Sequence, residues 1–121
     1  MKTEKLNEVL RGLNSSTSDI EASAIMSVDG LTIATMLSQS VDEDRVGAMS
    51  AAMLSIGQRT ARELHRGALE QVMVKGERGY VLIIGAGKEA VLTVVARETA
   101  RLGLVFLESK RAAKAIGELL S

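Results

Sequence analysis

Histidine 65 is the first residue whose chemistry could support catalysis, because it is the only histidine in the chain. A histidine acts as a general base when a partner orients its ring and a nucleophile lies within reach. The sequence identifies neither group near His65, and it contains no cysteine. We therefore interpret His65 as a surface or interface residue. No catalytic residue is predicted, and the chain is not expected to be an enzyme.

The segment Gly85-Ala86-Gly87-Lys88 resembles a phosphate-binding loop in composition. Such a loop requires G-x-x-x-x-G-K-[ST] at the start of a helix. Here Leu82 occupies the first glycine position, Glu89 follows the lysine, and an apolar run typical of a strand comes next. We predict a hairpin turn and no nucleotide or other cofactor site.

Three consecutive acidic residues, Asp42-Glu43-Asp44, could bind a hard cation through their carboxylates. The same residues fit the start of a helix, where negative side chains complement the helix dipole. Ser40 and Glu43 also have the spacing of a capping box. We favour the helix start and predict no metal site.

Composition excludes several classes of partner. The 15 basic residues balance the 15 acidic residues, and Tyr80 and Phe106 are the only aromatic residues. Nucleic-acid binding normally needs an excess of positive charge or stacking aromatic rings, so none is predicted. No apolar run reaches the roughly 20 residues of a membrane span, and the charged N-terminus lacks a signal sequence. We expect a cytoplasmic protein that does not insert into membranes.

Hydrophobic periodicity predicts one domain over residues 1–121, with the element order α-β-β-α-β-β-β-α. Asp29-Gly30 between two apolar runs predicts a type I′ hairpin, and Gly67 is a candidate helix end. The fold class is α/β, more closely α+β, with five mostly antiparallel strands and helices on both faces. The predicted helices are Thr3–Leu13, Asp42–Arg66 and Thr99–Leu120, and the predicted strands are Ala22–Val28, Leu31–Leu37, Leu69–Lys75, Tyr80–Ile84 and Ala90–Ala96.

The central helix contains no charged residue between Val46 and Gly57. At about 100° per residue, its larger apolar side chains share an arc of about 80°, which we predict to face the sheet. That arc contains Val46, Met49, Met53, Ile56 and Leu64.

A helix that lacks polar residues over most of its first half is expected to be buried on more than one side. We expect a second copy of the chain to cover the flank formed by Gly47, Ala51, Leu54 and Ala61. An alternative is that alanine and serine simply form helix on an exposed face. The arginine stripe Arg59, Arg62 and Arg66 could grip an acidic partner, or could be the solvated end of the helix.

Taken together, these elements resemble the Roadblock/dynein light chain family over nearly the whole chain. The segments that carry the resemblance are Ala24 to Leu31 with Ala34, the small-residue central helix, Gly79 to Ile84, Leu102 to Val105, and Arg111-Ala112-Ala113. The resemblance is greatest to the stand-alone prokaryotic members of the mutual gliding protein B type. It implies a profilin-like fold with a central five-stranded antiparallel sheet.

The resemblance also implies a homodimer in which the third strand pairs with its copy and the second helices lie side by side. On this chain the dimer interface would include Leu69, Gln71 and Met73 of the third strand together with the helix residues given above. The resemblance further implies docking of a small Ras-like GTPase on the paired helices. The docking residues would be Ala48, Ala52, Ser55, Arg59, Arg62 and Arg66.

Three functions therefore remain open. The first is a homodimeric, non-catalytic module that binds and regulates a small GTPase. The second is a structural subunit of a motor or signalling scaffold without GTPase contact. The third, a small-molecule sensor or compact enzyme, requires an apolar pocket with converging polar groups, and the sequence offers little toward one.

Overall fold

The computed structural model describes residues 2–38 and 41–121, and these residues form three helices and a five-stranded antiparallel sheet. The sheet order is β2-β1-β5-β4-β3. Both the element order and the antiparallel sheet predicted from the sequence are confirmed. The bounds are α1 Lys2–Ser16, β1 Ile20–Ser27, β2 Thr32–Met36, α2 Glu43–Glu63, β3 Gln71–Gly76, β4 Gly79–Ala86, β5 Ala90–Arg97 and α3 Leu102–Leu120.

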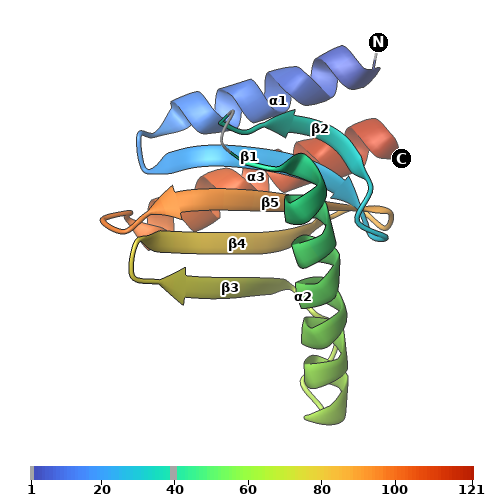
Figure 1. The fold of residues 1–121 in the computed structure, drawn as a ribbon. Coiled ribbons are helices and arrows are strands. Elements are labelled where there is room, and N and C mark those ends of the chain that lie inside the picture. The colour runs from blue at the N-terminus through green and yellow to red at the C-terminus, as the bar shows by residue number, and fades with distance from the viewer. Residues whose placement is uncertain (1, 39–40) are drawn as a thin grey trace.

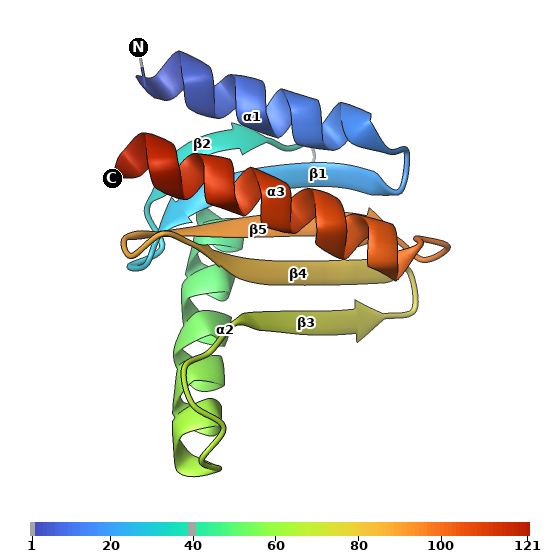
Figure 2. The ribbon, with the colours of Figure 1, turned by 180° about the vertical axis from the view of Figure 1, so that it is seen from behind.

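The sheet has unequal cover on its two faces. Helices α1 and α3 lie side by side across one face, whereas α2 alone crosses the other, near one end of the strands (Figures 1 and 2). The main apolar core fills the space between the sheet and the α1–α3 pair. Its buried members come from every element except α2 and β3, and the fully buried ones include Leu10, Ile25, Leu92 and Ile116.

Helix α1 runs further than its apolar stripe predicts. The predicted helix ends at Leu13, but residues 14–16 continue it. The hydroxyls of Ser15 and Ser16 donate to the carbonyls of Arg11 and Leu13, each at 2.7 Å. Asn14 instead turns toward the sheet, where it donates to the carbonyl of Met36 at 3.1 Å. Local hydrogen bonds therefore extend the helix through residues that usually favour loops.

The β1–β2 hairpin forms where Asp29-Gly30 predicts it, but its turn is not type I′. Only Gly30 has a positive φ, 89°, whereas a type I′ turn needs positive φ at both central residues. The amide of Gly30 donates to Ser27, and the amide of Ser27 donates to Leu31. This pattern is a three-residue loop whose left-handed glycine forms a bulge.

An ionic contact between the buried Asp19 and the largely exposed Arg101 ties the α1–β1 loop to the start of α3. The Asp19 carboxylate accepts from the backbone amide of Arg101 at 3.0 Å and from its Nε at 2.9 Å. These hydrogen bonds from Arg101 hold the pKa of Asp19 below its ordinary value. Arg101 is the N-cap residue of α3 and its side chain makes no capping hydrogen bond, so Asp19 satisfies one free amide at the start of this helix.

Candidate protein-interaction surface on helix α2

Helix α2 begins as its acidic residues predict. The side chain of Asp42 accepts from the backbone amides of Asp44 and Arg45, so Asp42 is the N-cap residue. The predicted capping residue, Ser40, lies outside the described residues. Glu43 instead accepts a hydrogen bond from the hydroxyl of Thr35 on β2 at 2.8 Å. The acidic group therefore starts a helix and fixes it to the edge of the sheet.

From that edge α2 crosses the strands in order. Ser50 shares a hydrogen bond of 2.8 Å with Thr93 of β5, and Gly57 packs beside Val72 of β3 at the opposite edge. The helix then continues past β3, beyond the sheet (Figure 1). Six residues, Gln58 to Glu63, form this overhang, which at 1.5 Å per residue is about 9 Å long.

Small residues, not large apolar ones, seat α2 on the sheet. Its buried residues are Gly47 and Ser50. A Cβ at Gly47 would overlap the carbonyl oxygen of Gly30, and a Cβ at Gly30 would lie 3.1 Å from that of Ala51. Leu54 lines a crevice with Ile83 and Val91 of the underlying strands. The backbone of α2 thus packs directly against the β1–β2 turn.

The predicted sheet-facing arc is therefore wrong for most of its members. Met49, Ile56 and Leu64 are 56%, 60% and 62% exposed, while Val46 and Met53 are half-buried. We call the four residues Met49, Met53, Ile56 and Leu64 the Met flank. The prediction placed the largest apolar side chains against the sheet because they are the most hydrophobic. In the structure, the β1–β2 turn approaches α2 so closely that only small residues fit at this contact.

In the lone chain, the α2 residues predicted to meet a second copy lie against their own chain. Gly47, Ala51 and Leu54 contact their own chain, and Ala61 is half-buried beside the loop that leads into β3. These side chains do not form a free flank. The apolar surface that α2 leaves uncovered is the Met flank.

The residues predicted to dock an outside partner are all exposed. We call Ala48, Ala52, Ser55, Arg59 and Arg62 the Arg flank, and they lie on the solvent side of α2 next to the Met flank. Arg59 pairs with Glu63 at 3.1 Å, and both side chains remain mostly in solvent. Arg66 lies beyond the helix, where its Nε donates to the carbonyl of Leu64 at 3.0 Å. The Arg flank therefore combines small side chains, which leave the helix surface flat, with positively charged ones.

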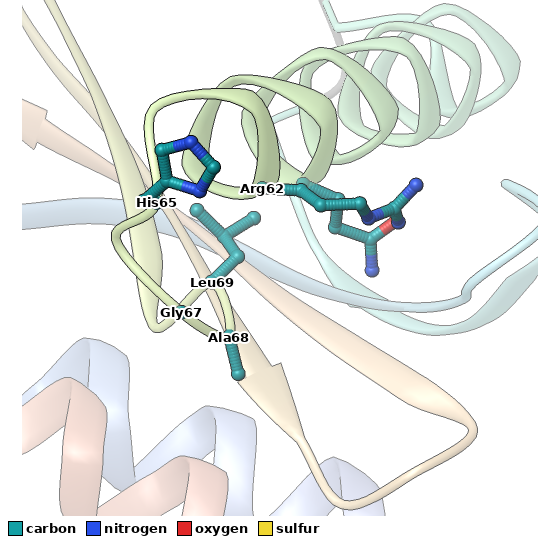
Figure 3. A pocket seen from close by; sticks show the side chains of 6 residues that line it. Arg62, His65, Gly67, Ala68 and Leu69 are labelled. Carbon is teal, nitrogen blue, oxygen red and sulfur yellow. The ribbon is translucent and has the colours of Figure 1, made fainter.

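The helix ends at Glu63 with Leu64 as its C-cap residue, and His65, not the predicted Gly67, takes the left-handed position that follows. His65 has a φ of 56°, in the left-handed region that glycine usually occupies after a helix. The amide of His65 donates to Arg62 and that of Arg66 donates to Ala61, as in a Schellman motif. Figure 3 shows Arg62, His65 and Leu69 around an open hollow of about 670 Å³ below the overhang. His65 is exposed, as the sequence predicts.

Strand β3 is the second exposed element beside α2. It lies at the edge of the sheet and pairs only with β4. Met73 and Val74 are 43% and 41% exposed, and Gln71 is half-buried. Leu69, predicted to begin this strand, is half-buried in the loop before it. An uncovered apolar edge strand is a place where another strand can pair.

The described residues do not assemble a recognisable chemical site. Gly87 to Glu89 form the β4–β5 turn, as predicted, and no group of acidic or histidine residues in the described chain could hold a metal ion. The crevice beside Leu54 has a volume of about 150 Å³, below the range of about 300–1,000 Å³ for ligand pockets. No described helix is long and apolar enough to cross a membrane.

Comparison with known proteins identifies the family. The Roadblock/LC7 domain family matches residues 6–96, which include both α2 and β3. The chain belongs to the Roadblock/LC7 family. The matched region therefore includes the exposed Roadblock surfaces described above.

Individual Roadblock relatives agree with this assignment. An uncharacterized protein of Methanocaldococcus jannaschii is 42% identical over 111 residues, which cover 92% of this chain and 96% of the relative. The solved gliding protein MglB from Thermus thermophilus is 25% identical, with a TM-score of 0.86 and coverage of 98% of this chain and 90% of that one. A second MglB, described as having a tetrameric arrangement, is 26% identical, with a TM-score of 0.88 and coverage of 98% and 89%.

Sequence reasoning missed two features of the Roadblock surface. One is the exposure of Met49 and Ile56, and the other is the contact between Gly30 and Gly47 that causes it. Two glycines 17 positions apart give no periodic signal. A usable clue was Gly47 itself, because a glycine inside a helix usually has a packing reason.

Proposed function

We propose that this chain is a cytoplasmic, homodimeric, non-catalytic module that binds and regulates a small Ras-like GTPase. The observation that carries the proposal is the exposed apolar Met flank of α2 next to the open edge of β3. Membership in the Roadblock family and similarity to MglB structures support the same function.

The proposed dimer pairs β3 with β3 of a second copy across a two-fold axis. The α2 overhang supports this arrangement, because about 9 Å of helix would span about two strands of the adjoining sheet. The Met flank would then pack against the second α2, and Leu69, Gln71 and Met73 would lie at the strand junction. Pairing would bury Ile56 and Val74, whose exposure is unfavourable in a lone chain.

The GTPase is proposed to dock on the Arg flank. Ala48, Ala52 and Ser55 offer a flat surface for close approach, and Arg59, Arg62 and Arg66 offer donors to acidic side chains. In the proposed dimer the two Arg flanks remain uncovered by the second copy, because the Met flanks face each other.

A pull-down with the small Ras-like GTPases of the source cell, each loaded with GDP or with a GTP analogue, tests the proposal. The wild-type chain is expected to retain the GTPase in at least one nucleotide state. Arg59→Glu with Arg62→Glu should weaken retention at least about tenfold, because like charges replace complementary ones. Arg111→Glu, on the opposite face of the molecule in α3, is the matched control and should retain the GTPase normally.

Lack of retention by wild-type protein in both nucleotide states, for every small GTPase of the source cell, would contradict the GTPase proposal. A stable dimer without GTPase binding would instead support the structural-subunit alternative. A compact sensor or enzyme is not proposed, because the described hollows are either open or too small.

A further inference from the structure

The buried core of this chain excludes the two elements that carry its exposed apolar surface. The core joins α1, β1, β2, β4, β5 and α3, and none of its buried members comes from α2 or β3. Local stability in a protein follows the number of buried apolar contacts that an element makes. The core is therefore able to persist when α2 is displaced.

Helix α2 covers Ile83 and Val91 of the sheet with the half-buried Leu54, but few of its own residues are buried. Its two buried residues are a glycine and a serine, and the serine makes a polar contact with Thr93. Gly47 and Gly57 also lower its intrinsic helix propensity. Most helical stability in proteins comes from packing of an apolar face, and here the most apolar flank lies in solvent.

Strand β3, like α2, is weakly packed and exposes apolar side chains. It has one neighbouring strand, and Met73 and Val74 are exposed on it. Gly57 of α2 packs near Val72 of β3 and Leu69 of the preceding loop, so the helix and the strand contact each other. The two elements are consecutive along the chain, and the C-terminal part of α2 lies beside β3 (Figure 1).

We propose that α2 and β3 form one unit that becomes fully ordered only when a second copy pairs with it. This inference rests on the proposed homodimer. Dimerisation then completes α2 and creates the surface on which a partner docks, in a single step. A lone chain is a folded core that carries a poorly held α2, and it has no complete docking surface. Partner binding consequently depends on the concentration of the chain itself.

Hydrogen exchange, measured peptide by peptide on the full chain, tests the proposal. Ile56→Glu places a charge in the Met flank with little loss of contact within the chain, because Ile56 is 60% exposed and glutamate is a good helix former. The expected result is a monomer whose α2 amides lose at least about tenfold protection, while those of α3 stay within about threefold of wild type. Leu107→Glu, at an exposed apolar position of α3, is the matched control and should change neither mass nor protection.

Four other outcomes overturn the inference. Retained α2 protection in monomeric Ile56→Glu would show that α2 is stable alone. Equal loss of protection in α3 would show that the chain opens as one unit. Should Ile56→Glu stay dimeric, the double variant with Val74→Glu is measured, and a dimer that survives both changes places the interface elsewhere. A monomeric wild-type chain would overturn the proposed homodimer together with this inference. The mass of the wild-type protein therefore distinguishes that failure from a failure of the inference alone.

Discussion

Two buried serines show how single polar groups affect this fold in opposite directions. Ser50 and Ser109 are 3% and 0% exposed, and each sits in a helix. The Ser50 hydroxyl is paired with Thr93, which joins α2 to the central strand β5. The Ser109 hydroxyl has no hydrogen-bond partner among the described residues. A buried polar group stabilises a fold only when it is paired.

We therefore expect Ser50→Ala to lower the free energy of unfolding by about 1 kcal/mol, because it leaves the Thr93 hydroxyl unpaired. Ser109→Ala should raise that free energy by about 1 kcal/mol, because it removes an unpaired hydroxyl and improves helix propensity. Exposed Ser55→Ala controls for propensity alone and should add about 0.5 kcal/mol. Urea denaturation checks all three, and equal effects at Ser50 and Ser109 would contradict this account.

The Asp19–Arg101 contact predicts a pH dependence of stability. Hydrogen bonds from Arg101 lower the pKa of Asp19 in the folded chain, so this contact stabilises the fold above the ordinary aspartate pKa of 3.8. The stabilisation is lost as pH falls through the lowered value. Asp19→Asn should therefore be less stable than wild type at pH 7, and the difference should shrink below about pH 4.

Denaturation at several pH values measures this difference. Arg101→Gln keeps the backbone amide that donates to Asp19 but removes the guanidinium, so it should reduce the pH-dependent part without abolishing it. A difference between Asp19→Asn and wild type that stays constant from pH 7 to pH 3 would show that the carboxylate charge is not involved.

At the scale of elements, the position of α2 depends on the contact between Gly47 and Gly30. Gly47→Ala should lower the free energy of unfolding by about 1–3 kcal/mol, because a methyl group would overlap the Gly30 carbonyl. Alanine is otherwise the better helix former. Gly12→Ala in α1, where no atom lies within 4 Å of the new methyl group, is the matched control and should stabilise by about 1 kcal/mol. Thermal unfolding measures both, and a stabilising Gly47→Ala would remove the explanation for the exposed Met flank.

The elements themselves could be predicted from periodicity and turn residues. The apolar runs of β4 and β5 predicted buried central strands, and Leu82, Ile84 and Leu92 are buried. The face of α2 that lies against the sheet could not be predicted, because it depends on the contact between two glycines that are distant in the sequence. The left-handed conformation of His65 could not be predicted either, since glycine, not histidine, usually occupies this position after a helix.

For the whole molecule, the structure changes which surface is expected to bind which partner. The Arg-flank residues are exposed on the solvent side of α2, so they remain the proposed docking surface. The expected dimer surface moves from Gly47, Ala51 and Leu54 to Met49 and Ile56. Periodicity separated the flanks of the helix correctly but could not show which of them faces the sheet, because that depends on tertiary contacts.

The central claim is that the Met flank and β3 are covered by a second copy. Light scattering at micromolar concentration tests it directly, on wild-type protein and on Ile56→Glu. Wild type should have about twice the chain mass of 12.9 kDa, and Ile56→Glu should have the mass of one chain, because a buried unpaired charge opposes pairing. A stable wild-type species of 12.9 kDa would contradict the account.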